Sequence, residues 1–338
     1  MAIRLGVVGV GALGIHHTRC AASSPRAQLV GVFEHHAERA RRALEFGARI
    51  FPTLPALLDE VDAIVVSTPT RSHHEVAAQA LVRGIACLVE KPLAASLAEA
   101  EILVGLAARH GAGLYVGHVE RMSQVLLAAR GLIRRPRFIE AHRLAPFGPR
   151  GLDVDVLLDL MIHDIDLTLH WTGSEPISVA AAGLSVLSSH IDIANARLEW
   201  ADGCVANLTA SRVSLERMRK VRLFQEDSYL SLDFLNHKGE MLRTNRTAIS
   251  AALDAAGGSS WNTEALLPQL LGFVSRQAIE PRKAEPLAAQ MESFLAAVAG
   301  EELDDLPHPA TGGEGLAAVR VASRIRESLS DRLRKWTE

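Results

Sequence analysis

Short apolar runs rich in β-branched residues alternate with amphipathic helical segments over the first 120 positions of the chain. Runs of about four to eight such residues, bounded by turn residues, predict β-strands. We expect strands at Ile3–Val8, Gln28–Phe33, Asp62–Ser67, Ile85–Val89 and Gly113–Val116. Ser72 with Glu75, and Ser96 with Glu99, have the spacing of a capping box and predict two helix starts. Strands that alternate with helices in this way predict a parallel, doubly wound α/β sheet.

The pattern changes after Arg121. A helical segment, Val154–Trp171, is followed by apolar runs that are separated by turn residues such as Ala201-Asp202-Gly203. Neighbouring strands joined by short turns predict an antiparallel sheet. Its expected strands are Ile191–Glu199, Cys204–Ala210, Val221–Gln225 and Tyr229–Phe234.

Helical patterns return near the end of the chain, at Leu287–Ala299 and at Leu316–Leu329. The second of these follows a Gly312-Gly313 pair, which we interpret as a helix breaker. The change of pattern, together with the length of the chain, predicts two domains, residues 1–120 and 121–338.

The composition is that of an ordinary folded protein, with 48% hydrophobic and 22% charged residues among 338. A formal charge of −3 and only 4% aromatic residues offer no basic or stacking face, so nucleic acid is excluded as a partner. No apolar run reaches the length of a membrane span, and no charged leader precedes the first strand. We therefore expect a cytoplasmic protein with no membrane partner.

The three cysteines, Cys20, Cys87 and Cys204, lie far apart and form no Cys-x-x-Cys pair. This spacing argues against a disulfide framework and against a structural zinc site. We expect all three to be small buried hydrophobic residues, and the chemistry proposed below requires no metal.

A glycine-rich turn, Gly9-Val10-Gly11-Ala12-Leu13-Gly14, directly follows the first strand and opens a helical pattern. Such a turn lets the pyrophosphate of a dinucleotide approach the backbone at a helix N-terminus. We therefore expect Gly9, Gly11, Ala12, Leu13 and Gly14 to bind a cofactor.

The second expected strand ends at Glu34, 20 residues after Gly14, where dinucleotide-binding domains carry the acid that binds the ribose. A carboxylate at this position repels a 2′-phosphate, so Glu34 favours NAD over NADP. His35 and His36 weaken the preference, because a protonated histidine tolerates a phosphate. The alternative is that Glu34 is a surface acid at the end of a strand.

Other polar segments also follow expected strands. In an open parallel sheet, ligands bind outside the carboxyl ends of the strands. These ends bring Glu34 and the glycine-rich turn to the same edge as Thr68-Pro69-Thr70, Glu90-Lys91-Pro92 and Gly117-His118. We expect Thr68, Pro69, His73 and Glu90 to contact the cofactor, and His118 to contact the substrate.

An acid and a histidine, Asp159 and His163, stand four residues apart within the helical segment Val154–Trp171. One helical turn separates them, so both side chains should face the same way. A histidine beside an acid is a candidate general base near neutral pH. The alternative is a helix that shows its polar residues to solvent, because Asp166 and His170 repeat the spacing.

Lys91 is the candidate electrophile. It follows an expected strand at the cofactor edge and precedes a proline, which restricts its backbone. An ammonium held there can donate to a substrate oxygen and stabilise developing alkoxide charge. The alternative is a solvated lysine in a loop.

On the glycine-rich turn, the Glu90-Lys91-Pro92 triplet and Asp159 with His163 leading into Asp164-Ile165-Asp166, the chain resembles the glucose-fructose oxidoreductase, inositol dehydrogenase and rhizopine-catabolism (Gfo/Idh/MocA) family. The resemblance covers nearly the whole chain. It implies a Rossmann domain, then an α/β domain with an open, mostly antiparallel sheet, assembled as a homodimer or homotetramer.

The resemblance also implies that Lys91, Asp159 and His163 are the catalytic residues. Oxidation of a secondary alcohol would follow: His163 takes the hydroxyl proton, Lys91 polarises the oxygen, and hydride passes to the nicotinamide of NAD. Asp159 would orient His163 and favour its charged form, whereas Lys91 would oppose that charge. Which effect prevails is left open by the residues alone.

Seven arginines lie between Arg121 and Arg150, with Glu140 as the single acid among them. Such an excess can bind a phosphate or carboxylate of the substrate. We expect Arg121, Arg143 and Arg150 to bind the substrate, because they adjoin motif or strand segments, and we expect Arg134, Arg135 and Arg137 to be solvated.

The stretch Phe138–Phe147, continuing through Arg150 to Asp166, resembles the branch of the family that oxidises the 3-hydroxyl of UDP-N-acetylglucosamine for amino-sugar lipid A synthesis. Three alternatives remain open. They are a dehydrogenase of a free sugar or an inositol-like polyol, an oxidoreductase that keeps its cofactor bound, and a regulator that binds nucleotide or sugar without catalysis.

Overall fold

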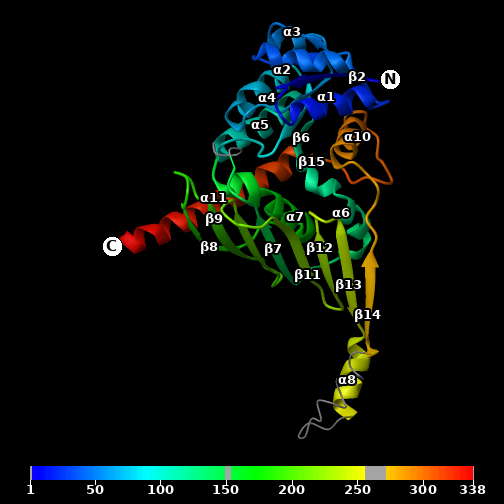
Figure 1. The fold of residues 1–338 in the computed structure, drawn as a ribbon, viewed down its shortest axis with the longest axis vertical. Helices are drawn as coiled ribbons and strands as arrows, with labels where there is room; N and C mark the ends of the chain where they lie inside the picture. Colours follow the sequence, from blue (N-terminus) through cyan, green and yellow to red (C-terminus); the bar gives the residue numbers. More distant parts are fainter. Residues whose placement is uncertain (1, 149–153, 256–271, 338) are drawn as a thin grey trace.

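The strands of the protein form two β-sheets, and helices pack on them. The computed structural model describes residues 2–148, 154–255 and 272–337. In Figure 1 the sheet of the N-terminal part lies above the second sheet, and the helix α11 (Gly312–Thr337) passes between them. α11 packs on α5 (Leu97–His110) of the first layer and on α7 (Ile162–Thr172) of the second. One helix, α11, therefore packs against both layers.

The first sheet has the strand order β15-β6-β5-β4-β1-β2-β3, and all its pairings are parallel except that of β15 with β6. This arrangement confirms the expected doubly wound sheet, with strand ends shifted by at most a residue or two. β3 was missed because two residues are too few to form a pattern. The strands are β1 (Ile3–Val8), β2 (Ala27–Phe33), β3 (Arg49–Ile50), β4 (Ala63–Val66), β5 (Ala86–Glu90), β6 (Leu114–Gly117) and β15 (Ala310–Thr311).

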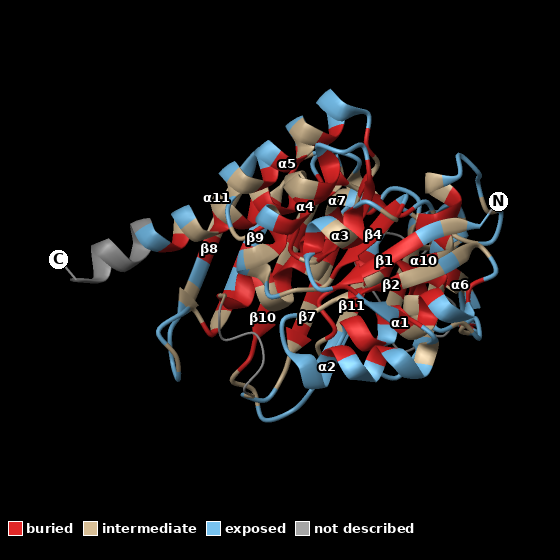
Figure 2. Ribbon diagram, turned by 90° about the horizontal axis from the view of Figure 1, so that it is seen from above, coloured by how far each residue is buried: buried red, intermediate tan, exposed pale blue. Residues whose placement is uncertain are grey.

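Helices cover both faces of this sheet, with a hydrophobic core on each side. Figure 2 shows the buried central strands β1 and β4 beneath helices whose outer surfaces are exposed. The helices of this part of the chain are α1 (Gly14–Ser23), α2 (Ala37–Arg42), α3 (Leu54–Leu58), α4 (His73–Leu81) and α5, with short 3₁₀ turns η1 (Ala43–Phe46) and η2 (Thr70–Ser72).

One of the two expected capping boxes forms and the other does not. Ser96 Oγ accepts from Glu99 N at 3.3 Å, and Glu99 Oε2 accepts from Ser96 N at 3.2 Å, which confirms the start of α5. The expected box at Ser72 is wrong, because its side chain caps nothing. Ser72 already has helical backbone angles, as the last residue of the 3₁₀ turn η2, and an N-cap residue requires extended ones.

The second sheet has the order β14-β13-β12-β11-β7-β10-β9-β8. Its pairings are antiparallel except that of β7 with β10, so the expected antiparallel sheet is confirmed in the main. Helices pack on one face, and the other face is open. The strands are β7 (Phe138–Leu144), β8 (Ser178–Leu184), β9 (Ile193–Glu199), β10 (Val205–Ser211), β11 (Met218–Phe224), β12 (Ser228–Asp233), β13 (Lys238–Thr244) and β14 (Val274–Ile279).

The remaining helical elements lie around the second sheet or lead into it. Along β7, Ile139, Ala141 and Arg143 are buried on the helix-covered side, and the residues between them are half-buried. The elements are η3 (Val119–Met122), α6 (Gln124–Ala129), η4 (Arg130–Leu132), η5 (Leu157–Met161), α7, α8 (Arg246–Ala255), α10 (Pro286–Val298) and α11.

The C-terminal part of the chain returns to the first sheet, so a single division at residue 120 does not describe the fold. Met291, Phe294 and Leu295 of α10 lie in the same core as the residues of β1. Ala310–Thr311 then adds the antiparallel strand β15 beside β6. The apolar pattern of α10 predicts a helix, but it does not indicate which of the two sheets that helix packs against.

The glycine pair 312–313 begins a helix, where we had expected a breaker. Thr311 Oγ1 accepts from Glu314 N at 3.2 Å, and Glu314 Oε2 accepts from Thr311 N at 2.8 Å. This is a capping box at the start of α11. No helix of the described chain combines the length and hydropathy that crossing a bilayer requires. The three cysteines are free and buried, as expected.

The two serines at 72 and 96 give a matched test of capping. Ser96→Ala should lower the free energy of unfolding by about 1 kcal/mol, because it removes an N-cap hydrogen bond. Ser72→Ala should change it by a few tenths at most. Urea unfolding of both variants measures the difference, and equal losses would contradict the assignment of the cap.

Candidate active site

The glycine-rich turn packs against the loop after β4. Gly9 has a φ of +86°, and a Cβ there would lie 2.9 Å from the backbone of Ser67 and Thr68. A Cβ on Gly14 would lie 1.9 Å from the carbonyl oxygen of Gly9. At Gly11, in contrast, a Cβ would meet nothing within 4 Å, because this glycine borders an open cleft. Two glycines thus shape the turn, and the third leaves space beside it.

Two adjoining clefts run along the carboxyl ends of the parallel strands. One, of about 710 Å³, is lined by Gly9, Gly11 and Glu34 among others. The other, of about 460 Å³, is lined by Leu13, His73, Glu90 and Lys91. Both include Ser67, Thr68, Pro69 and Arg71, so they form one continuous groove. Of the residues expected to bind the cofactor, only Ala12 and Gly14 do not line it.

Glu34 stands at the far end of this groove. Its carboxylate accepts from Val10 N at 2.8 Å and from His36 N at 3.0 Å, which ties the end of β2 to the glycine-rich turn. His35, His36 and Arg39 line the same cleft. The end of β2 therefore presents one carboxylate among basic side chains.

His73 and Glu90 line the groove with side chains that are largely buried. The ring nitrogens of His73 lie 2.9 Å from the Pro92 carbonyl oxygen and 3.0 Å from that of Thr68, so this side chain joins the two loops. Glu90 Oε1 lies 2.7 Å from His17 Nε2 of α1. Burial disfavours the Glu90 carboxylate, but the His17 hydrogen bond and nearby charges bring its pKa below the usual value. Glu90 thus links α1 to the neighbouring Lys91.

Lys91 meets Asp159 across the two sheets. Lys91 Nζ donates to the Asp159 carbonyl oxygen at 2.6 Å and lies 3.2 Å from Oδ1 of the same residue. Both side chains are about one-fifth exposed, at 21% and 23%. The Lys91–Pro92 peptide bond is cis. A lysine ammonium has three N–H donors, so one is left for another ligand.

Asp159 lies in a π-helical turn, η5, and not in the continuous α-helix expected from Val154 to Trp171. Asp155 Oδ1 accepts from Leu158 N at 3.1 Å at the start of this turn. Within the described chain, no hydrogen bond joins Asp159 to His163, so the expectation that Asp159 orients His163 is wrong. A π turn is wider than an α turn, which alters how residues four apart line up.

His163 follows η5 at the start of α7, and its Nδ1 is buried. Neither ring nitrogen has a hydrogen-bond partner among the described residues. Burial holds the pKa of His163 well below its ordinary value, and the positive charge of Lys91 lowers it further. Arg143, His118 and Arg219 act in the same direction. The effect of Lys91 therefore prevails, and the imidazole is neutral at neutral pH.

Two of the expected substrate-binding arginines are occupied by carboxylates. Arg143 donates to both oxygens of Asp164, at 2.9 and 2.8 Å, and to Glu120 Oε1 at 2.8 Å. Its side chain is only 4% exposed. Three of its five donors are thus engaged in a buried fork. The expectation that Arg143 binds the substrate is corrected, because a new anion would have to displace these carboxylates.

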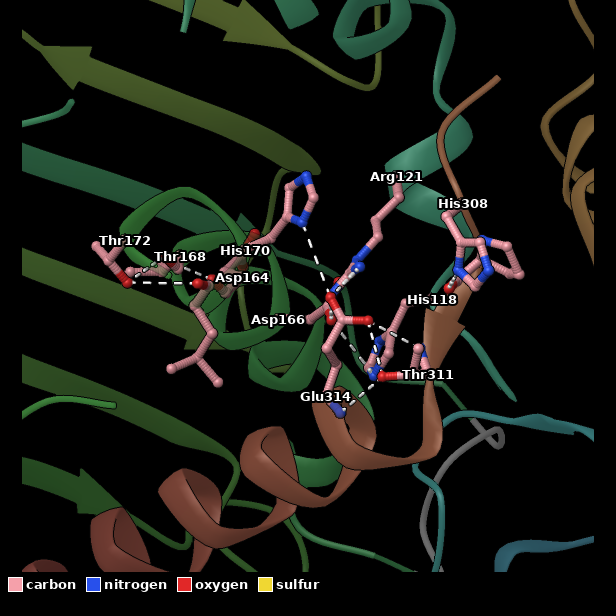
Figure 3. Close-up of polar contacts among 12 residues, drawn as sticks. His118, Arg121, Asp164, Asp166, Thr168, His170, Thr172, His308, Thr311 and Glu314 are labelled. Atoms are coloured by element: carbon pink, nitrogen blue, oxygen red, sulfur yellow. Dashed lines mark hydrogen bonds and ion pairs between the residues drawn. The ribbon is translucent and has the colours of Figure 1, made fainter. Parts of the chain in front are cut away.

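Arg121 is held in the same way. It donates to Asp166 at 2.9 and 2.6 Å and to Glu314 Oε1 at 2.7 Å. Figure 3 shows Arg121 and Asp166 facing Glu314 of α11, with His118 close by. The assignment of Arg121 to the substrate is corrected for the same reason. Arg150 lies outside the described residues.

His118 lies at the end of β6, buried beside this network. Its Nε2 is 3.7 Å from Asp166 Oδ1, and its Nδ1 has no partner in the described chain. Burial lowers the pKa of His118, and the charge of Asp166 offsets part of that effect. His17, His118 and His163 each have a buried Nδ1 without a partner in the described chain, and all three lie near Glu90 or Lys91. Unsatisfied nitrogens at one place indicate a site for a ligand or water.

Sequence reasoning missed two residues of this site. His17 follows the glycine-rich turn, but no spacing rule links it to Glu90. Arg219 could have been found, because it is in phase with the buried positions Val221 and Leu223 of β11. A cation on the inward face of a strand faces either a buried acid or a ligand.

Comparisons with known proteins match both parts of the chain. An oxidoreductase family model with an NAD-binding Rossmann fold matches residues 3–118, and the GFO/IDH/MocA C-terminal domain matches residues 127–229. A UDP-N-acetylglucosamine 3-dehydrogenase from Acidithiobacillus ferrooxidans is 39% identical over 326 residues, or 96% of each chain. An inositol 2-dehydrogenase from Rhizobium meliloti is 25% identical over 98% of each chain.

A solved structure gives the same result. The UDP-N-acetylglucosamine 3-dehydrogenase from Acidithiobacillus ferrooxidans has a TM-score of 0.83 to this chain at 37% identity. The superposition covers 97% of this chain and 98% of that one. The similarity thus extends over both layers of the fold.

Because Arg143 holds two buried carboxylates, its substitution should cost much of the free energy of unfolding. Arg143→Gln should lower the free energy of unfolding by about 3–5 kcal/mol, because it leaves Asp164 and Glu120 buried without their partner. Arg222→Gln is the matched control. It removes a half-exposed pair with Glu140 and should cost about 0–1 kcal/mol. Chemical unfolding measures both, and equal costs would contradict a structural role for the fork.

Proposed function

Because the chain belongs to the Gfo/Idh/MocA family of NAD-binding oxidoreductases, we propose that it oxidises a secondary hydroxyl of a sugar, the 3-hydroxyl of UDP-N-acetylglucosamine. The observation that carries this proposal is the meeting of Lys91 with Asp159 beside His163. Lys91 lines the groove, and its charge acts on the neutral imidazole of His163, which the second part of the fold supplies. This pair can remove a proton from an alcohol and stabilise the oxygen that remains.

His163 acts as the general base. A base must be deprotonated before it can accept a proton, and the lowered pKa keeps His163 neutral. Its ring nitrogens have no partner in the described chain, so one is available to the substrate hydroxyl. The positive groups around it disfavour the protonated ring, so the proton leaves the ring readily after reaction.

Lys91 acts as the electrophile. Two of its donors are directed to Asp159, which fixes the ammonium, and the third can donate to the substrate oxygen. As the oxygen loses its proton, the positive charge stabilises the developing alkoxide in a partly buried site. Asp159 is a positioning residue in this account, because it holds Lys91 and does not touch the reacting atoms.

The groove fits a dinucleotide. Gly11 leaves open space beside the turn, and Gly9, Thr68 and Pro69 line the path toward Lys91. Glu34 would hold the ribose hydroxyls and repel a 2′-phosphate, which favours NAD, with NADP the less favoured alternative. When bound, the nicotinamide would accept the hydride from the carbon that bears the hydroxyl.

The substrate is proposed from the relative that is 39% identical, and support comes from its coverage of 96% of both chains. We further propose that the chain assembles as a homodimer or homotetramer in the cytoplasm. The open face of the second sheet supports assembly, since Phe138, Phe224 and Tyr229 form a ring cluster on it with centroids 5.8 and 4.9 Å apart. A sheet face with such rings is suited to packing on another chain.

The proposed function is tested with the purified protein, a panel of free and UDP-linked sugars, and either NAD or NADP. Nicotinamide absorbance should rise with NAD and UDP-N-acetylglucosamine. Activity on free sugars or polyols alone would reject the nucleotide sugar. No activity across the panel would favour a regulator that binds without catalysis.

The pH dependence follows from the charges around His163. Its pKa is lowered, so the active neutral form persists on acidification and is lost only as pH falls through the folded-state pKa. The acidic limb of kcat/KM should therefore lie below the ordinary histidine value of about 6.5. Rates measured from pH 5 to 9 give the limb, and one centred above pH 7 would contradict a base surrounded by Lys91, Arg143, His118 and Arg219.

A further inference from the structure

Arg219 of β11 and Arg143 of β7 are paired residues in the second sheet. Opposed residues in an antiparallel pair point to the same side, so both arginines lie on the helix-covered face. Their environments differ. Arg143 is buried in its carboxylate fork, whereas the Arg219 side chain is 49% exposed.

Glu120 lies between these two guanidinium groups and is already bound. Its Oε1 is 2.8 Å from Arg143 Nη1 but 3.6 Å from Arg219 Nη1, which is beyond hydrogen-bonding distance. In the described chain, the Arg219 guanidinium donates no hydrogen bond. Arg143 also takes both oxygens of Asp164, so nearby carboxylate charge is largely committed to Arg143. Arg219 is left with free donors on an accessible side chain.

The Arg219 guanidinium, which has Glu120 as an ion-pair partner at 3.6 Å, lies near the reacting centre. It stands opposite Arg143, which binds Asp164, the residue next to His163. Its positive charge is among those that lower the pKa of His163, as is the charge of Lys91. Arg219 is therefore a cation near the position proposed for the substrate hydroxyl. None of the other arginines considered for the substrate in the described chain has this combination of exposure and position.

We propose that Arg219 forms an anion subsite that binds a phosphate group of the sugar substrate. This rests on the proposed function, since it assumes a phosphorylated sugar at the His163–Lys91 centre. In a nucleotide sugar the diphosphate is attached through an oxygen to carbon 1, and carbon 1 is separated from the hydroxyl-bearing carbon 3 by carbon 2. The planar guanidinium can donate two parallel hydrogen bonds to phosphate oxygens. The subsite would favour phosphorylated sugars over free sugars and polyols.

Two variants of neighbouring residues test the subsite. Arg219→Gln removes the proposed ligand. Lys220→Gln removes the same charge from the next residue, whose side chain points to the opposite face of the sheet. Each variant is assayed for KM and kcat with UDP-N-acetylglucosamine. Calorimetry measures the Kd of UDP with NADH saturating, so that UDP cannot occupy the dinucleotide groove, and thermal unfolding confirms that both variants are folded.

The expected result is specific to one variant. Arg219→Gln should raise both the KM for UDP-N-acetylglucosamine and the Kd of UDP by about 10- to 100-fold, since a charged hydrogen-bonding partner is lost. Its kcat should change much less, and Lys220→Gln should resemble the parent protein in all three. Arg219→Lys keeps the charge without the fork and should fall between the parent and Arg219→Gln.

Failure of the subsite and failure of the proposed function give different results. If the parent oxidises UDP-N-acetylglucosamine and Arg219→Gln leaves KM and Kd unchanged, the subsite is wrong and the function stands. If the parent binds UDP but does not oxidise the nucleotide sugar, and Arg219→Gln weakens UDP binding, the subsite stands and the proposed substrate is wrong. Equal losses in both variants, or no binding of UDP by the parent, would overturn the subsite.

Discussion

The contact between Lys91 and Asp159 is the interaction on which the active site depends. It joins the end of β5 in the first sheet to a π-helical turn above the second sheet, and the two residues are 68 positions apart in the chain. Without it, the cofactor groove and the histidine-bearing helix would be two surfaces with no shared substrate position. The ammonium is held by a carbonyl and a carboxylate together, so its direction is set while one donor stays free.

The helix that carries His163 is itself held by buried charge. Asp164 and Asp166 of α7 receive the forks of Arg143 and Arg121, and Arg121 also reaches Glu314 at the start of α11. α11 packs on both layers, so these ion pairs connect α7, which carries His163, to a helix that contacts both sheets' layers. Burial of so many ionic groups is costly unless each is paired, which these are. These pairs hold α7 beside the uncharged imidazole of His163, the proposed general base.

Much of the fold could be predicted because it rests on local patterns. The strands of the first sheet, the capping box at Ser96 and the cofactor turn all follow from periodicity and spacing over a few residues. The π turn at Asp159, the return of α10 to the first sheet and the capture of Arg121 and Arg143 do not. They depend on contacts between residues far apart in the chain. The sequence alone does not distinguish an arginine that binds a carboxylate within the protein from one that binds a substrate. Lys91 and His163 remain the predicted catalytic residues, but the partner of Asp159 was assigned wrongly for this reason.

In the proposed mechanism, Asp159 acts through Lys91 at a site formed between the two sheets. A double-mutant cycle on single-turnover hydride transfer tests it most directly, using Lys91→Met, Asp159→Asn and the double variant with the sugar that the parent oxidises. The double variant should be no slower than Lys91→Met alone, because Asp159 has nothing to position once the ammonium is gone. If the losses of rate in the two single variants multiply in the double variant, the two side chains act independently and Asp159 does not work through Lys91.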